Sequence, residues 1–120
     1  DLDLALEAAD GVIRILRADR TSATLLRILR WASVPLKLAN RVGDAAAALL
    51  ESYNHATHLG LRSEMWHNAE ALLDLSLDCE DTSSATKWGA ACVAMAGHPM
   101  VAGRLGSANF AYLQARIAFM

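Results

Sequence analysis

Apolar residues recur at steps of three and four along nearly the whole chain, a spacing that places them on one face of an α-helix. The pattern is clearest over residues 45–79, AAAALLESYNHATHLGLRSEMWHNAEALLDLSLDC, where two such stripes lie on either side of Gly60. No segment alternates apolar and polar residues between hairpin turn signals, as a half-buried strand would. The chain is also rich in alanine and leucine, which favour helix. We therefore predict an all-α fold.

The apolar stripes, the N-cap residues and the helix-breaking prolines and glycines divide the chain into five or six amphipathic helices. We expect these helices to pack as consecutive helical hairpins in a small bundle. The second helix should end or kink at 33–35, because a residue that precedes proline avoids the helical region. Pro35 can then begin the third helix, with a break allowed at Gly43. The polar segment 80–84 offers several N-caps for a later helix. The expected helices cover, in order, about 2–18, 22–34, 35–59, 63–77, 84–97 and 99–120.

The length of 120 residues is enough for one core without disulfide bonds, and we predict a single helical domain over 1–120. Hydrophobic residues make up 54% of the chain and charged residues 20%. This is more apolar than an average soluble domain and indicates either a well-filled bundle or a face that binds a partner. No stretch approaches the roughly 18 consecutive apolar residues of a membrane-spanning helix.

The formal net charge is −2 and the pI about 6.1, so the whole-chain charge does not attract nucleic acid, and we expect no nucleic-acid partner. The charges are nonetheless segregated along the sequence. The first third carries the basic residues Arg14, Arg17, Arg20, Arg27, Arg30, Lys37 and Arg41. Residues 64–81 carry the acidic residues Glu64, Glu70, Asp74, Asp78, Glu80 and Asp81. Two solvated faces of opposite sign would explain this, and so would a bipolar surface that orients the chain in a larger assembly.

Cys79 and Cys92 form no C-x-x-C motif and fall at apolar helical positions, where cysteine behaves as a small hydrophobe. This usage favours an intracellular reducing compartment. The chain begins at Asp1 and not at methionine, which is consistent with an organellar (mitochondrial) protein whose targeting peptide has been removed, or with a trimmed chain.

Three of the four histidines gather near the turn at Gly60, together with two glutamates. Spacings of three and four put Glu51 with His55, His55 with His58, and Glu64 with His67 on shared helix faces. Imidazole and carboxylate suit zinc or iron, so these five residues are the candidate metal ligands. Against this hypothesis, Glu-x-x-His occurs once where di-iron bundles need it twice, and histidine near a helix C-terminus is favoured without any metal.

Catalytic signatures are absent from the sequence. It contains no G-x-S-x-G elbow, no P-loop, no dinucleotide fingerprint and no C-x-x-C-H for haem attachment. We predict no catalytic residues, no cofactor and no enzymatic activity.

A protein interface is the remaining function that the sequence supports. Tryptophan and arginine are both enriched at interfaces. The candidate interface residues are Arg14, Arg17, Arg27, Arg30, Trp31 and Trp66. The expected partners are other protein subunits of a larger complex. The region Arg14–Arg41 could alternatively bind an anionic membrane surface, with Trp31 at the interface.

The stretch 45–79 also resembles the helix pairs of pentatricopeptide and tetratricopeptide repeat proteins. Leu49-Leu50-x-x-Tyr53 is similar to the first helix of such a pair, and Glu70-Ala71-Leu72-Leu73-Asp74-Leu75 to the second. The segment between them is longer than the pentatricopeptide pattern permits, and Thr57 occupies the position where that pattern has glycine. The match covers about a third of the chain, and the neighbouring stretches 22–42 and 84–118 keep the helical pairing without the motif. It implies an interaction scaffold whose helix pairs stack side by side. The residues that read RNA in such repeats are not identifiable, so the resemblance does not extend to RNA binding.

We therefore expect a non-enzymatic helical scaffold or accessory subunit. A small metal-binding bundle and a membrane-surface protein are the alternatives.

Overall fold

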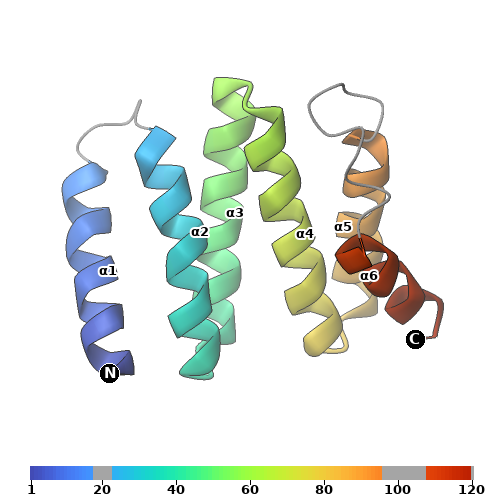
Figure 1. Ribbon diagram of the computed structural model, residues 1–120, viewed down its shortest axis with the longest axis horizontal. Coiled ribbons are helices and arrows are strands. Elements are labelled where there is room, and N and C mark those ends of the chain that lie inside the picture. Colours follow the sequence, from blue (N-terminus) through green and yellow to red (C-terminus); the bar gives the residue numbers. More distant parts are fainter. Residues whose placement is uncertain (18–22, 96–107, 120) are drawn as a thin grey trace. The chain divides into compact units, whose positions relative to one another are not determined.

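The computed structural model describes residues 1–17, 23–95 and 108–119, and over these ranges the chain is helical with no strand (Figure 1). The described helices are α1 (Leu2–Leu16), α2 (Ala23–Leu38), α3 (Val42–Leu59), α4 (Arg62–Asp78), α5 (Thr82–Met95) and α6 (Ala108–Ala118). The predicted all-α fold is confirmed, and the described residues form six helices where five or six were expected. The expected helix stop at Gly97 and helix start at Pro99 lie outside the described residues.

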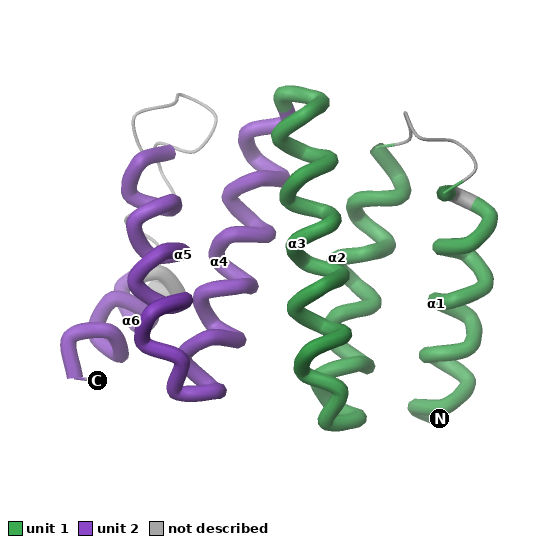
Figure 2. The backbone as a smooth tube through the Cα atoms, turned by 180° about the vertical axis from the view of Figure 1, so that it is seen from behind, with its two compact units in different colours: residues 1–60 green, residues 61–120 purple. Residues whose placement is uncertain are grey.

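The chain, predicted as one domain, divides into two compact units of equal length (Figure 2). The first unit, Asp1–Gly60, contains α1, α2 and α3. The second unit, Leu61–Met120, contains α4, α5 and α6.

In the first unit α2 packs against both α1 and α3. Its core cluster joins Ile13 of α1 with three residues of α2, Leu25, Leu29 and Ala32. Removing a leucine side chain from water stabilises a fold by roughly 1.5–3 kcal/mol, so these contacts supply much of the force that holds the three helices together. A buried hydrogen bond also fixes the orientation of α3 against α2, because the Ser52 hydroxyl of α3 donates to the Leu26 carbonyl of α2 at 2.6 Å.

In the second unit α4 is buried on most of its surface. Its buried residues are Met65, Trp66, Asn68, Ala69, Leu72, Leu73, Leu75, Ser76 and Leu77. Helix α5 packs along α4 and buries Ala85, Trp88, Cys92 and Met95. Helix α6 contacts both helices, and its Leu113 is fully buried. Nine of the seventeen residues of α4 are therefore buried, more than one narrow apolar stripe would place against its neighbours.

Two connections of three residues, 39–41 and 79–81, have the same backbone geometry. Each contains one residue in the left-handed region, Asn40 with φ 61° and Glu80 with φ 56°. In each, the N–H of the following residue donates to the carbonyl five residues earlier, at 2.8 Å in the first and 2.9 Å in the second. This is the Schellman motif, which satisfies the last carbonyls of a helix and reverses the chain. The two connections therefore produce two antiparallel hairpins, α2 with α3 and α4 with α5.

The hairpins recur with a period of 40 residues. Helices α1, α3 and α5 begin at residues 2, 42 and 82. Helix α2 buries Leu25, Leu26, Leu29, Ala32, Ser33 and Leu36, and α4 buries the residue 40 positions later at each of these six places. The sequence alone did not reveal this repeat, because the matched positions share burial but hardly any side-chain identity.

The position of Pro35 corrects the predicted boundary between the second and third helices. Pro35 lies inside α2, which continues to Leu38, and the Ala39 N–H donates to the Pro35 carbonyl at 2.9 Å. Proline removes one helical hydrogen bond, but the buried Leu36 and the Schellman motif that follows it hold the last turn in place. The helix therefore ends at the 39–41 connection, and α3 starts at Val42 with Gly43 in its first turn.

The predicted N-cap in segment 80–84 is Asp81. Its carboxylate accepts hydrogen bonds from the Ser84 backbone N–H at 3.1 Å and from the Ser84 hydroxyl at 2.8 Å. These two bonds hold the pKa of Asp81 below its usual value, because they favour the ionised carboxylate. The stabilisation from this cap is therefore fully present at a pH above the ordinary pKa of an aspartate, and it is lost as the pH falls through the lowered pKa of Asp81.

Replacing Glu80 by glycine should stabilise the chain. A side chain in the left-handed region costs about 1 kcal/mol, and glycine avoids that cost, so we expect Glu80→Gly to raise the free energy of unfolding by up to about 1 kcal/mol. Urea denaturation followed by circular dichroism measures the change. Glu80→Ala is the matched control, because alanine removes the carboxylate and keeps the unfavourable backbone conformation. An equal gain in both variants, or a loss in Glu80→Gly, would contradict this account.

Candidate functional site

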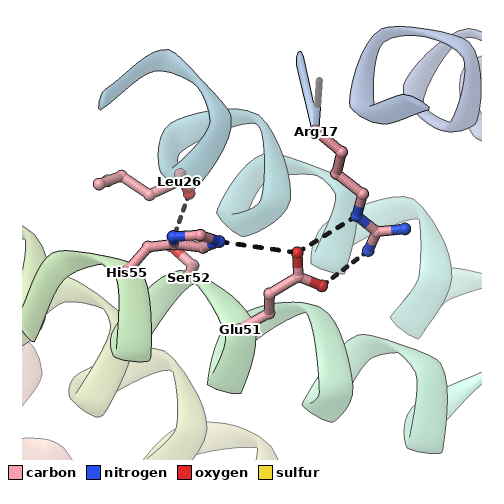
Figure 3. Close-up of polar contacts among 5 residues, drawn as sticks. All are labelled: Arg17, Leu26, Glu51, Ser52 and His55. Carbon is pink, nitrogen blue, oxygen red and sulfur yellow. Dashed lines mark hydrogen bonds and ion pairs between the residues drawn. The ribbon is translucent and has the colours of Figure 1, made fainter. Parts of the chain in front are cut away.

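The polar cluster around Glu51 links α3 to the end of α1 (Figure 3). The Arg17 guanidinium donates to both carboxylate oxygens, with Nη2 at 2.7 Å from Oε1 and Nε at 3.2 Å from Oε2. His55, one turn further along α3, has its Nε2 3.9 Å from the Glu51 Oε2. Glu51 is one-third exposed and Arg17 more than half exposed, so this bidentate pair contributes modestly to stability. Its effect is to orient the end of α1 against α3.

The five predicted metal ligands are distributed over both units. Glu51 and His55 lie together, and His58 is exposed further along α3. Glu64 and His67 lie in the first two turns of α4, in the second unit. Across the described parts of the chain, no group of three or more His, Cys, Asp or Glu side chains is placed to hold a metal ion. The Glu51 carboxylate, which a metal would need, is occupied by the Arg17 guanidinium.

The predicted interface residues differ in exposure. Arg14, Arg17 and Arg27 are exposed and Arg30 is half-buried. Trp31 is 60% exposed, as an interface tryptophan should be. Trp66 is only 1% exposed and is a core residue of α4, so the interface prediction is wrong for this residue. Trp66 was named because tryptophan is enriched at interfaces, but a tryptophan of a small domain can equally belong to the core, and α4 buries this one.

Trp31 belongs to an exposed stripe that we name the outer face of α2. It consists of Arg27, Trp31, Val34 and Leu38, which follow one another at steps of four, three and four on one side of the helix. Val34 is 59% exposed and Leu38 is 73% exposed. Val34 and Leu38 were missed in the sequence, because a helix that ends at 33–35 cannot place them in line with Trp31. The extension of α2 through Pro35 creates this face.

The outer face of α2 is basic at its edges. Arg27 and Lys37 are exposed and Arg30 is half-buried, and α2 contains no acidic residue. The opposite side of the same helix carries the buried leucines of the core. The predicted acidic segment behaves differently: Arg116 of α6 lies 3.5 Å from Asp74 and 3.1 Å from Asp78, which neutralises part of it within the second unit.

Both units contain cavities that their own residues line, and one in each unit lies between packed helices. The cavity of the first unit, about 480 Å³, has an apolar floor that includes Ile13 and Leu29 and a charged rim that includes the Arg17–Glu51 and Arg41–Asp44 pairs. The described residues that line it include no Ser, Cys, His or Lys, the side chains that most often form a nucleophile with its base. The cavity of the second unit, about 290 Å³, lies between α5 and α6 and is mostly apolar.

The two cysteines are free thiols in different environments. Cys79 is exposed, whereas Cys92 is buried in the α4–α5 hairpin. Burial, with a smaller contribution from the negative charge of Glu70, raises the pKa of the Cys92 thiol to about 12. The Cys92 thiol therefore stays protonated, and it acts as a small apolar side chain.

Comparison of the chain with protein-family models, with curated proteins and with solved structures finds no match. Within the described helices, none is both long enough and apolar enough to cross a lipid bilayer.

Cys79 and Cys92 should differ sharply in reactivity. A thiol reacts as the thiolate, so at pH 8 iodoacetamide should alkylate Cys79 in the native chain and leave Cys92 unmodified. In urea both residues should react, because unfolding removes the burial that raises the pKa of Cys92. Mass spectrometry of the Cys79→Ser variant isolates the Cys92 signal. Rapid alkylation of Cys92 in the folded chain would show that the α4–α5 contact is not closed.

Proposed function

We propose that this chain is a non-enzymatic helical scaffold or accessory subunit that acts through contacts with other proteins of a larger assembly. The observation that carries the proposal is the outer face of α2. It exposes a tryptophan, a valine and a leucine in one line on a helix whose opposite side is buried.

The composition of this face suits a protein interface. Trp31, Val34 and Leu38 offer apolar area that is already exposed, and tryptophan commonly dominates the energy of an interface. The packed opposite side of α2 holds the backbone in place, so binding costs little reorganisation. The positive charges of Arg27 and Lys37 beside this stripe favour a partner whose matching surface is acidic.

The 40-residue recurrence of the hairpin supports a scaffold role. Proteins built from recurring helix pairs stack them into extended surfaces and bind partners along them. The resemblance of 45–79 to pentatricopeptide and tetratricopeptide helix pairs points in the same direction.

Photo-crosslinking tests the proposal. A photoreactive amino acid at Val34 should crosslink the chain to one defined protein in the cells from which it comes, identified by mass spectrometry. Leu38→Glu should weaken that complex by about tenfold or more, because it places a charge in the apolar stripe. Leu38 is 73% exposed, so the fold should lose less than about 0.5 kcal/mol.

Val93→Glu is the matched control. Val93 is 54% exposed on α5, and the same change of an apolar side chain to an acid there should leave the complex intact. The absence of any crosslinked protein from Val34 would overturn the proposal.

The same face also supports a second function, binding to an anionic membrane surface. Exposed Trp31 and Leu38 beside Arg27 and Lys37 match the composition of helices that lie in the headgroup region of a bilayer. Sedimentation with phosphatidylserine vesicles at low salt, reversed at high salt and abolished by Leu38→Glu, would favour this function. If the chain does not sediment with these vesicles at low salt, membrane binding is excluded and a protein partner is favoured.

A further inference from the structure

The outer face of α2 has the spacing of a seam between two helices. Trp31 and Leu38 lie seven residues apart, and so do Arg27 and Val34. This is the a/d pattern of a coiled coil, in which each side chain of one helix inserts between four side chains of a second helix. The eleven positions from Arg27 to Leu38 extend about 16 Å along the axis of α2. The face therefore has the length and the repeat that a second helix of about three turns would fill.

The apolar stripe on this face is also narrow. Trp31 and Val34 are exposed, whereas Ala32 and Ser33, which lie between them in the sequence, are buried in the first unit. An apolar stripe confined to a/d positions is typical of a helix pair, whereas a helix that lies in a membrane surface buries a broader apolar face. The width of the stripe therefore favours one helix over a bilayer.

Two positive charges lie near the ends of the stripe. Arg27 comes one turn before Trp31, and Lys37 is next to Leu38 at the other end, and both basic side chains are exposed. The ten positions between them correspond to about 15 Å along the axis. A helix with an acidic residue near each end of its own apolar stripe can place one carboxylate beside each of these charges.

A second copy of the same face lacks this complementarity. If two outer faces pair in parallel, Arg27 of one copy lies beside Arg27 of the other. If they pair antiparallel with Trp31 opposite Val34, each Arg27 lies opposite Leu38 and no carboxylate is near it. Helix α2 contains no acidic residue that could correct either arrangement. The charges therefore favour a different protein as the partner.

We propose that the outer face of α2 binds a single amphipathic helix of another protein, whose apolar stripe repeats at steps of three and four and has an acidic residue near each end. The inference rests on the proposed function, because it names the partner element for the same face. Trp31, Val34 and Leu38 supply the apolar contact, and Arg27 and Lys37 select the partner by charge. Helices bound in this way are read through apolar anchors at helical spacing.

Isothermal titration calorimetry of the 120-residue chain with three designed peptides tests the proposal. The first peptide, of about 21 residues so that it can be helical, has leucines at steps of three and four and a glutamate near each end of the leucine stripe. The second has lysines in place of the two glutamates. The third has the composition of the first, but its leucines alternate with polar residues.

We expect the first peptide to bind about tenfold more tightly, or more, than either of the others. Leu38→Glu should abolish its binding, because the change places a charge in the apolar stripe. Val93→Glu is the matched control and should leave the binding unchanged, since Val93 is exposed on α5 and not on the outer face of α2.

A charge reversal in the chain separates recognition by charge from apolar contact. The variant with both Arg27→Glu and Lys37→Glu should prefer the lysine peptide to the glutamate peptide, and circular dichroism checks that its helix content is unchanged. Equal binding of the glutamate and lysine peptides, equal binding of the first and third peptides, or no binding of the first peptide would each overturn the inference.

The crosslinking experiment at Val34 distinguishes the two possible failures. If the first peptide does not bind and Val34 still crosslinks to one defined protein, this inference is wrong and the proposed function stands. If Val34 crosslinks to no protein, the proposed function itself fails. Sedimentation with phosphatidylserine vesicles without any binding of the first peptide would overturn the inference and assign the face to a membrane surface.

Discussion

The two short connections at 39–41 and 79–81 are the constraint on which the rest of this structure depends. Each ends a helix with paired backbone hydrogen bonds around one left-handed residue and leaves the next helix no direction except back along the first. Because the backbone of the connection sets the direction of the second helix, the apolar stripes of the two helices in a hairpin need only face each other in register. The hairpin forms in both units, although the side chains that fill its interior differ.

The recurring hairpin separates positions that keep a common role from positions that do not. Buried positions agree at an interval of 40 residues, but the exposed ones diverge: Val34 and Leu38 of α2 correspond to Asp74 and Asp78 of α4. The first pair contributes to an apolar surface, whereas the second pair binds Arg116 of its own unit. A common fold therefore carries two different outer surfaces, and the function has to be argued from those surfaces and not from the fold.

Periodicity and capping were sufficient to predict the helices, because amphipathic spacing is a local property of the chain. They failed at Pro35. Whether the helix continues past this proline depends on the burial of Leu36, and burial depends on tertiary packing that local spacing does not show. That failure also concealed the outer face of α2, since Leu38 joins Trp31 only on a continuous helix. Trp66 shows a different error: residue type alone suggested an interface, but α4 is buried on more sides than one stripe predicts. The spacing of Glu51 and His55 correctly placed them on one face of a helix, but Arg17, the residue that binds Glu51, is 34 positions away in the chain.

The burial of α4 has an evolutionary consequence. A helix with nine buried residues among seventeen has few positions at which a change of side chain leaves packing unaffected, so α4 should change slowly and in concert with its neighbours. Helix α2, at the corresponding place in the first hairpin, has one side that the core does not use. New specificities can arise on that side without disturbing the fold. Substitutions in α4 are therefore limited by packing, whereas substitutions on the exposed side of α2 are not.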